Sequence, residues 1–202
     1  MRVASVVLAA GLSSRMGFNK LVAPVCGKPL IQHVLELVAG VELFSERVLV
    51  LGYMHGDVYR SIDRSILEMF RVVVNESYFE GLGSSVRKAV MEVQEGVNAI
   101  MFFNGDTPFV KRSTVLKLLD VYGSLKPLIV APSHRGVRGT PVLLDSSLRG
   151  ELLSLRGDVG ARSIFPRYRD RMVVVDVEDP GILFDIDTPE DLMKANNMCY
   201  NL

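Results

Sequence analysis

The sequence predicts an α/β fold in which helices cover both faces of a mostly parallel central sheet. Short β-branched runs alternate with amphipathic stretches along the whole chain, and this alternation is typical of repeated βαβ units. Several runs, such as AIMFF at Ala99–Phe103, are apolar throughout, as expected for strands covered on both faces. A length of 202 residues with 49% apolar residues favours one domain, residues 1–202, with a sizeable core.

The predicted strands are short apolar runs bounded by polar or glycine-containing segments. In chain order they are Val3–Leu8, Arg47–Leu51, Arg71–Asn75, Ala99–Phe103, Leu128–Ala131, Val142–Leu144, Met172–Asp176 and Leu183–Ile186. The polar and basic segment Ser133–Thr140 shows no such pattern, and we expect it to be a mobile loop.

The predicted helices are the amphipathic stretches between these strands. In chain order they are Pro29–Val38, Asp57–Phe70, Ser84–Glu95, Ser113–Tyr122, Ser146–Leu153, Val159–Phe165 and Pro189–Asn196. Val86, Val90 and Val93 lie three and four residues apart, so they are expected to form one buried helix face. Thr188 before Pro189 gives the last helix a capping residue followed by a proline at its first position.

Composition and charge exclude several classes of protein. The chain carries 23 basic and 23 acidic residues, so no general nucleic-acid surface is expected and any anion site must be local. No apolar run approaches the roughly 20 residues needed to cross a bilayer, and the amino terminus lacks a signal-peptide cleavage pattern. We therefore expect a cytoplasmic protein without membrane contact. Cys26 and Cys199 form no CxxC pair and are expected to be free thiols.

The segment LAAGLSSRMGFNK directly follows the first predicted strand. A loop beyond the carboxyl end of a strand is a prime position for phosphate in an open α/β sheet. Ala9, Ala10 and Gly11 allow close approach of the backbone to a ligand, and Arg15 and Lys20 supply positive charge. The Gly-Lys-Ser/Thr of a P-loop and the GxGxxG of a dinucleotide fingerprint are both missing. The pattern therefore favours another type of anion-binding loop, with an ordinary strand-to-helix connection as the alternative.

Acidic residues follow two other predicted strands. Asp106, in the turn Asn-Gly-Asp, comes directly after an apolar strand, where a carboxylate can hold Mg²⁺ on a bound polyphosphate; the alternative is a simple turn. Asp185 and Asp187 alternate with apolar residues, so both are expected on one face of the last strand. Asp187, at the strand's end, is the better candidate for a metal ligand, and the alternative is a charged strand exit. Together with the basic glycine loop, these carboxylates fit phosphoryl or nucleotidyl transfer.

Two further segments combine glycine with polar side chains. Gly81–Ser85 opens a helix whose amides and hydroxyls can bind a base, a ribose or a phosphate, but the third glycine of a dinucleotide fingerprint is missing. In LRGDVGAR, Asp158 and Arg162 are expected either to reach an acceptor substrate or to lie in a surface turn. Of the three histidines, only His134 in the basic segment is a candidate functional residue.

These motifs together resemble those of a known family. LAAGLSSRMGFNKLVAPVCGKPLIQHVL resembles the amino-terminal signature of the MobA-like nucleotidyltransferases. The later motifs GLGSSVRKAV, NGDTPFV, RGTPVLL, RGDVGAR and FDIDTPEDL follow in the order of the molybdenum cofactor cytidylyltransferase branch. The resemblance spans nearly the whole chain. It implies one Rossmann-like domain of the nucleotide-diphospho-sugar transferase type, which uses Mg²⁺ to move a nucleotide from an NTP to an acceptor phosphate with release of pyrophosphate.

The resemblance also implies roles for individual residues. Nucleotide contacts would come from Leu8, Ala9, Ala10, Gly11, Arg15, Lys20, Asn75, Gly81, Ser84 and Ser85. The catalytic residues would be Arg15, Lys20 and Asp106, and the Mg²⁺ ligands would be Asp106 and Asp187. The acceptor side would include Arg138, Thr140, Asp158 and Arg162.

Ala10 bears on the choice of base, because LAAG accompanies cytidine users in this family and LAGG accompanies guanylyltransferases. The resemblance thus implies CTP as donor and molybdopterin or the molybdenum cofactor as acceptor, with a molybdoenzyme or its chaperone as a transient partner. Two departures concern the acceptor: the branch usually has Met where Thr107 stands and His where Thr140 stands. The alternatives are GTP, another phosphorylated acceptor such as a sugar or alcohol phosphate, or, in another class, a non-catalytic carrier of nucleotide or cofactor.

Overall fold

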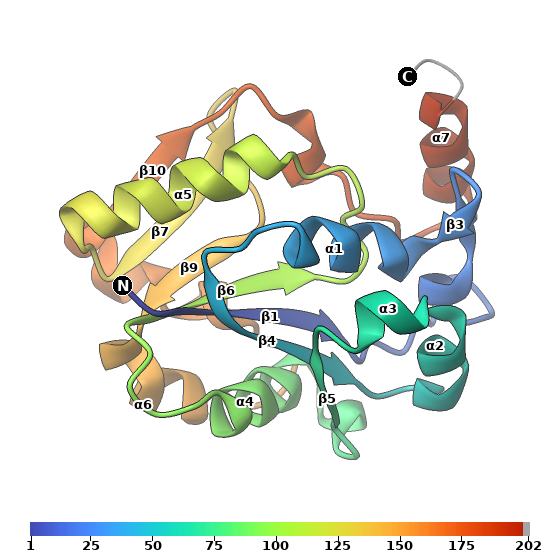
Figure 1. Ribbon diagram of the computed structural model, residues 1–202, viewed down its shortest axis with the longest axis horizontal. Coiled ribbons are helices and arrows are strands. Elements are labelled where there is room, and N and C mark those ends of the chain that lie inside the picture. The colour runs from blue at the N-terminus through green and yellow to red at the C-terminus, as the bar shows by residue number, and fades with distance from the viewer. Residues whose placement is uncertain (200–202) are drawn as a thin grey trace.

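The structure, a computed structural model, describes residues 1–199. Its centre is a sheet with the strand order β10-β7-β9-β6-β1-β4-β5, and β8 pairs with β7 (Figure 1). A separate hairpin consists of β2 (Pro24–Val25) and β3 (Lys28–Pro29). The strands of the main sheet are β1 (Val3–Ala9), β4 (Phe44–Leu51), β5 (Arg71–Val74), β6 (Ala99–Asn104), β7 (Ile129–His134), β8 (Val137–Arg138), β9 (Val142–Asp145) and β10 (Met172–Asp176).

The strand directions confirm the prediction of a mostly parallel sheet. β1 pairs in parallel with β4 and β6, β4 with β5, and β7 with β10. β9 runs antiparallel between β6 and β7, and β8 runs antiparallel to β7. The carboxyl ends of β1, β4, β5 and β6 therefore meet at one edge of the sheet, where ligands bind in open α/β folds.

Helices cover both faces of the sheet, as predicted. Figure 1 shows α1 and α5 on one face and α4 and α6 on the other. Val86 and Val90 of α4, and Val93 directly after it, are 2% exposed or less, which confirms that these three side chains are buried together. Within residues 1–199, none of the helices is long and apolar enough to span a membrane. The helices are α1 (Leu30–Ala39), α2 (His55–Ser61), α3 (Arg64–Leu67), α4 (Leu82–Glu92), α5 (Arg112–Leu125), α6 (Arg149–Leu153) and α7 (Pro189–Cys199).

Residues 57–70 form two helices instead of the one that was predicted. α2 ends at Ser61, and α3 begins at Arg64. The buried side chain of Gln32 fixes the break between them: its Nε2 donates to Asp63 Oδ2 at 3.1 Å, and its Oε1 accepts from the Asp63 amide at 3.0 Å. Because this contact comes from α1, the local sequence pattern did not reveal it.

The predicted strand Leu183–Ile186 is wrong. Pro180–Leu183 forms a 3₁₀ turn that Asp179 caps, since its side chain accepts from the Gly181 amide. The following residues pair with no strand but still reach the sheet edge, because the Ile186 amide donates to the Asp106 carbonyl at 3.0 Å. The predicted helix Val159–Phe165 is likewise a 3₁₀ segment, Ala161–Arg171.

The expected mobile loop Ser133–Thr140 is a hairpin in the structure. Ser133 pairs with Arg138 and His134 with Val137, in the ladder between β7 and β8. Arg135 and Gly136 have φ values of 51° and 80°, which suit a two-residue hairpin turn. His134 is buried, and its Nδ1 lies 2.8 Å from the Val177 carbonyl oxygen, so it has a structural contact here.

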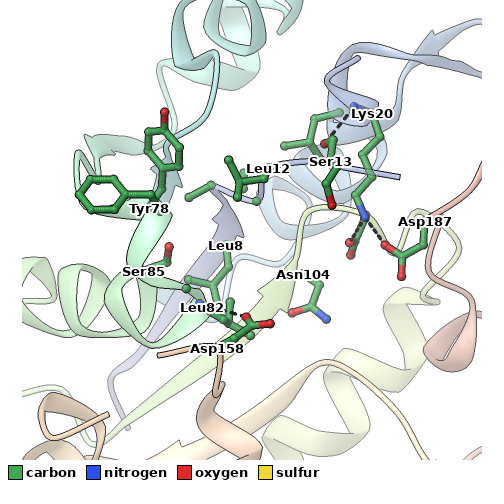
Figure 2. A pocket seen from close by; sticks show the side chains of 18 of the residues that line it. Leu8, Leu12, Ser13, Lys20, Tyr78, Leu82, Ser85, Asn104, Asp158 and Asp187 are labelled. Atoms are coloured by element: carbon green, nitrogen blue, oxygen red, sulfur yellow. Dashed lines mark hydrogen bonds and ion pairs between the residues drawn. The ribbon is translucent and has the colours of Figure 1, made fainter. Parts of the chain in front are cut away.

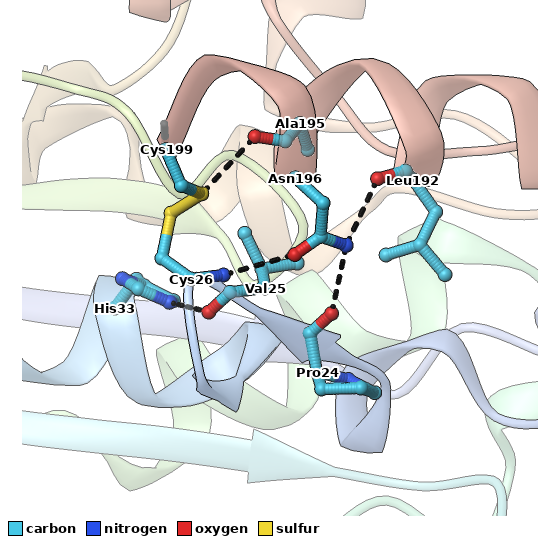
Figure 3. Close-up of a disulfide and its surroundings, with 8 residues drawn as sticks. All are labelled: Pro24, Val25, Cys26, His33, Leu192, Ala195, Asn196 and Cys199. Atoms are coloured by element: carbon cyan, nitrogen blue, oxygen red, sulfur yellow. Dashed lines mark hydrogen bonds between the residues drawn. A yellow bond between two sulfur atoms is a disulfide. The ribbon is translucent and has the colours of Figure 1, made fainter. Parts of the chain in front are cut away.

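The two cysteines are not free thiols: Cys26 and Cys199 form a disulfide with a Cα–Cα distance of 5.4 Å. Figure 3 shows it joining the β2–β3 turn to the last turn of α7. Asn196 reinforces the connection, because its Oδ1 accepts from the Cys26 amide and its Nδ2 donates to the Pro24 carbonyl. The partners are 173 residues apart in the chain, so their proximity depends on tertiary structure that spacing does not show.

Candidate active site

A pocket with a volume of about 590 Å³ opens at the carboxyl-end edge of the sheet. The loop after β1 and the start of α4 border it (Figure 2). Most of the predicted nucleotide contacts line it, namely Leu8, Ala9, Ala10, Gly11, Arg15, Lys20, Gly81 and Ser85. Asp106, Asp187 and Asp158 line it as well. The structure thus brings together residues from five distant parts of the sequence.

The loop after β1 is folded by its own short contacts. The Met16 amide donates to the Ser13 carbonyl at 2.9 Å, and Gly17 has a φ of 74° that favours glycine. Asn19 caps the 3₁₀ turn Lys20–Val22, because its Oδ1 accepts from the Leu21 amide. The Lys20 amide donates to Ser13 Oγ at 3.2 Å. These contacts fix the Lys20 backbone while its side chain extends into the pocket.

Asp106 is positioned by the turn that follows β6. The Gly105 amide donates to the Leu8 carbonyl at 2.9 Å, which continues the pairing of β6 with β1. A Cβ at Gly105 would lie 2.9 Å from Ile31 Cδ1 and 3.2 Å from the Leu8 carbonyl oxygen, so the close approach favours glycine. The prediction that Asp106 lies at the carboxyl end of a strand, near the Leu8–Ala10 loop, is confirmed by this geometry.

Asp187 reaches the same place from the segment before α7. The Ile186 amide binds the Asp106 carbonyl, and α7 starts immediately after Thr188, whose Oγ1 accepts from the Asp191 amide at 3.2 Å. Asp191 Oδ2 in turn accepts from the Thr188 amide at 3.1 Å. The predicted cap at Thr188 is therefore present, and it anchors the residue next to Asp187.

Four charged side chains meet in the pocket. Lys20 Nζ donates to Asp106 Oδ2 at 2.7 Å and to Asp187 Oδ1 at 2.5 Å (Figure 2). The second oxygen of Asp187 pairs with an Arg15 guanidinium nitrogen at 2.7 Å. The Lys20 side chain is 10% exposed, whereas that of Arg15 is 65% exposed. Lys20 is therefore the buried centre of the network, and Arg15 lies at its open side.

The network shifts the pKa values of its members. Burial of Lys20 opposes its charge, but attraction and hydrogen bonds from Asp106 and Asp187 outweigh burial and raise the pKa of Lys20. Burial also opposes ionisation of Asp187, yet Lys20 and then Arg15 hold its pKa below the ordinary value. Burial and the neighbouring carboxylates of Asp187 and Asp106 raise the pKa of Asp185. Asp185 therefore interacts with Asp187 and Asp106, although the strand face on which Asp185 and Asp187 were predicted to lie is not formed.

The residues present fit a divalent metal bound together with a polyphosphate. Asp106 Oδ1 is buried without a hydrogen-bond partner among the residues described, so one carboxylate oxygen has unused capacity. No group of three His, Cys, Asp or Glu side chains within residues 1–199 is arranged to hold a metal. Mg²⁺ is usually held by one or two carboxylates plus substrate phosphates, and Asp106 and Asp187 provide that number.

The part of the pocket lined by Ala10 and Gly81 is built on close glycine contacts. A Cβ at Gly52 would lie 2.7 Å from Ala10 Cβ and 2.8 Å from Tyr78 Cβ, so the Ala10 methyl packs against Gly52. Gly81 has a φ of 96°, and a Cβ there would lie 2.6 Å from the Gly157 carbonyl carbon. The segment around Asp158 therefore lies directly on the start of α4.

Asn75 and Ser84 lie beneath the pocket and do not line it. Both are buried, and Asn75 Nδ2 donates to Ser84 Oγ at 2.8 Å and to Ser85 Oγ at 3.0 Å. Asn75 Oδ1 accepts from the Ser77 amide. The structure thus gives Asn75 a supporting position under Ser85, where it does not contact the pocket directly.

The predicted acceptor-side residues are only partly brought together. Asp158 lines the pocket, and its Oδ1 lies 3.4 Å from the Leu82 amide. Arg138 and Arg162 lie near each other and near Asp185: burial and then Arg138 lower the pKa of Arg162, and Asp185 opposes them. Thr140 is 5% exposed, and its amide donates to the Ile182 carbonyl. None of these last three predicted residues lines the pocket.

Sequence reasoning missed several lining residues, namely Leu12, Tyr78, Phe79 and Asn104. Tyr78 and Phe79 directly precede Gly81, so their closeness to that motif is a usable signal. Gly52 was also missed, although a glycine directly after a strand that neighbours β1 is a sign of close packing.

The fold and the loop motif define the class of protein. The mostly parallel sheet, with the LAAG loop at its carboxyl edge, has the NTP transferase fold. The chain belongs to the MobA-like NTP transferase domain family, whose model matches residues 5–172. The resemblance drawn from the motifs is thereby confirmed.

Two curated relatives match along almost the whole chain. Nicotine blue oxidoreductase of Paenarthrobacter nicotinovorans is 32% identical over 208 residues, covering 95% of each chain. Molybdenum cofactor cytidylyltransferase of Escherichia coli K12 is 26% identical over 195 residues, covering 94% of this chain and 93% of the relative.

A solved structure matches over a similar extent. Rv0371c from Mycobacterium tuberculosis H37Rv is 27% identical with a TM-score of 0.83, covering 98% of this chain and 99% of that one. A second structure of Rv0371c is a complex with manganese, with a TM-score of 0.77 and 24% identity over the same shares.

Proposed function

We propose that the protein transfers CMP from CTP to the phosphate of molybdopterin or the molybdenum cofactor and releases pyrophosphate, with Mg²⁺ as its metal. The observation that carries the proposal is the network of Lys20 and Arg15 with Asp106 and Asp187 beside the LAAG loop. Two cations and two carboxylates at one strand edge supply what a reacting polyphosphate needs, namely charge neutralisation and metal ligands.

The chain's own residues have distinct parts in the proposed reaction. An oxygen of the acceptor phosphate attacks the α-phosphorus of CTP in line, and the bond from that phosphorus to the bridging oxygen of pyrophosphate breaks. Lys20 and Arg15 stabilise the charge on the departing pyrophosphate. Asp106 and Asp187 would hold Mg²⁺, which when bound neutralises charge on the phosphates. No nucleophilic side chain is needed.

The other predicted residues would bind the two substrates. Leu8 and the backbone of Ala9, Ala10 and Gly11 would contact the nucleotide from one wall, and Gly81 and Ser85 from the other. The acceptor would lie on the side of Asp158, and its anionic groups would extend toward Arg138 and Arg162, which lie near Asp185.

Two comparisons support the finer points of the proposal. The Escherichia coli relative is a molybdenum cofactor cytidylyltransferase, which supports both the base and the acceptor. The manganese complex of Rv0371c supports a divalent metal. Because CTP and the cofactor are intracellular metabolites, we propose a cytoplasmic site of action and transient contact with a molybdoenzyme or its chaperone.

The test is pyrophosphate release with CTP or GTP, Mg²⁺ and the molybdenum cofactor. The proposal expects release that depends on the acceptor and is faster with CTP. Preference for GTP rejects the base assignment. Release that instead requires a sugar or alcohol phosphate rejects the acceptor. Tight CTP binding without turnover on any acceptor supports a carrier module in place of an enzyme.

The 32% identity to nicotine blue oxidoreductase favours a second candidate, a redox reaction on a related dye-like substrate. The discriminating measurement is the absorbance of NADH or NADPH mixed with nicotine blue and the protein. Consumption of the reduced nucleotide that requires the protein supports this candidate. Its absence, together with pyrophosphate release from CTP, supports nucleotidyl transfer.

A further inference from the structure

The Lys20 ammonium stands where a cation shared by Asp106 and Asp187 would stand. It donates to one oxygen of each carboxylate, at 2.7 Å and 2.5 Å, and its side chain is 10% exposed. The two carboxylates already share one buried positive charge. A divalent ion that binds both carboxylates must therefore compete with Lys20 for the same oxygens.

The protein by itself offers a divalent ion few further ligands that would favour it over Lys20. Asp106 and Asp187 are not joined by a third ligating side chain to form a metal-holding group within the described part of the chain. Of the two remaining oxygens, Asp106 Oδ1 is buried with no hydrogen-bond partner in residues 1–199, and Asp187 Oδ2 pairs with Arg15. Mg²⁺ and similar ions demand near-octahedral coordination, so two carboxylates leave most positions to other ligands.

The backbone of Lys20 is held in place, whereas its side chain can change conformation. Its amide is bound by Ser13 Oγ, and the 3₁₀ turn that it begins is capped by Asn19. Asn19 is itself held by the Tyr53 carbonyl at 2.9 Å. A lysine has a flexible four-carbon stem and a compact charge, so the ammonium can leave the carboxylates without a backbone change. Lys20 lines the pocket together with Gly11 and Arg15, where a triphosphate would attract it.

We propose that Lys20 is an internal cation that keeps divalent metal off Asp106 and Asp187 until a nucleoside triphosphate draws its ammonium away. The phosphates would then neutralise the charge of the Lys20 ammonium and, in the same step, supply the remaining ligands of the metal. Without them, the metal must displace a buried ammonium and leave it unpaired, which is costly. The binding of metal and nucleotide is therefore coupled, and each raises the affinity of the other by the same factor. This inference rests on the proposed function only in taking the pocket's ligand to be a nucleoside triphosphate.

The experiment measures Mn²⁺ binding by electron paramagnetic resonance, with and without the non-reacting α,β-methylene analogue of CTP. For the unaltered protein we expect weak binding of Mn²⁺ alone and at least tenfold tighter binding with the analogue. Lys20→Met keeps an unbranched side chain one atom shorter and removes its charge, so it should bind Mn²⁺ alone at least tenfold more tightly and show less coupling. Lys28→Met is the control, because Lys28 pairs with Glu36 on an exposed surface, and it should match the unaltered protein.

Equal or weaker Mn²⁺ binding by Lys20→Met, or tight binding by the unaltered protein without nucleotide, overturns the inference. Circular dichroism confirms folding, and Lys20→Gln replaces Lys20→Met if the latter does not fold. The outcome is separate from the proposed function. Tighter metal binding in the variant without cytidylyl transfer by the unaltered protein supports Lys20 as the internal cation and rejects the reaction. Cytidylyl transfer by the unaltered protein, with no change of metal binding in the variant, supports the reaction and rejects Lys20 as the internal cation.

Discussion

At the scale of single residues, Asp106 is the side chain on which the proposed chemistry depends most. It is held by the Gly105 turn beside β1, accepts from Lys20, and has one buried oxygen that pairs with none of the described residues. Asp106→Asn keeps the shape and removes the charge that is proposed to hold the metal, so kcat for pyrophosphate release should fall by about 100-fold or more. Asp57→Asn, at an exposed pair with Arg60, serves as the control. An unchanged kcat in a folded Asp106→Asn protein would reject the role.

Ala10 is the residue expected to set the choice of base. Its methyl packs against Gly52 and is 5% exposed at the pocket wall, so removing it gives the wall room to accept a larger ring. One methyl in a binding pocket is worth roughly tenfold or more in discrimination. Ala10→Gly should therefore lower the ratio of kcat/KM for CTP over GTP by about tenfold. The same ratio in both proteins would show that the selection lies elsewhere.

At the scale of elements, the contact between the end of β4 and the end of β1 shapes the pocket. A Cβ at Gly52 would lie within 3 Å of Ala10 and Tyr78 atoms, so Gly52→Ala must push the two apart. We expect a loss of roughly 1–3 kcal/mol in the free energy of unfolding and weaker CTP binding. Gly150→Ala in α6 is the matched control, because nothing lies within 4 Å of its new Cβ. Urea unfolding and calorimetric titration measure both effects, and equal behaviour of the two variants would contradict the packing argument.

The disulfide joins two elements that both lead into the site. Lys20 lies a few residues before the β2–β3 hairpin, and Asp187 lies just before α7, so Cys26–Cys199 links the segments that carry them. Closing so long a loop should stabilise the fold by roughly 2–4 kcal/mol. Cys199→Ser should lower the urea concentration at the midpoint of unfolding. A reducing dithiol should lower the midpoint of the unaltered protein and leave that of the variant unchanged. A midpoint that is insensitive to both would mean that α7 is held by packing alone.

The elements that the sequence predicted correctly are those with a strong local pattern. β1, β6 and α4 follow from apolar runs and from the spacing of Val86, Val90 and Val93. The errors fall where contacts between distant residues determine the local structure. Gln32 interrupts the predicted helix at Asp63, and the Ile186 amide donates to the Asp106 carbonyl, so its segment does not pair as a strand.

The candidate site shows the same division. Asp106 and the LAAG loop were placed together correctly because the carboxyl ends of parallel strands meet at one edge. The bridging position of Lys20, the support that Asn75 gives to Ser85, and the pairing of Cys26 with Cys199 depend on side-chain positions in three dimensions. No spacing in the chain encodes them.

At the scale of the whole molecule, the charge network predicts how stability depends on pH. The pKa of Asp187 is lowered from 3.8, so its contribution is complete above that value and is lost as the pH falls through the lowered pKa. The pKa of Lys20 is raised from 10.5, so its contribution is complete below that value and is lost as the pH rises through the raised pKa. Stability should thus be greatest between these limits.

Lys20→Met removes the common partner and should flatten both ends of the profile. At acid pH the variant will keep the part of the pH dependence that comes from Glu36 and Asp145. Their pKa values are also lowered, although burial acts to raise them. Urea unfolding of both proteins across the pH range measures the difference. Parallel profiles would show that the network adds nothing to stability.

The measurement that tests nucleotidyl transfer at this site most directly is a crystal structure with CTP and Mn²⁺, the metal being located by its anomalous scattering. We predict manganese between Asp106 and Asp187, the triphosphate along the Gly11–Lys20 loop with the Lys20 ammonium moved onto it, and the cytosine between Ala10 and Ser85. CTP bound outside this pocket, or manganese bound away from both carboxylates, would contradict the assignment.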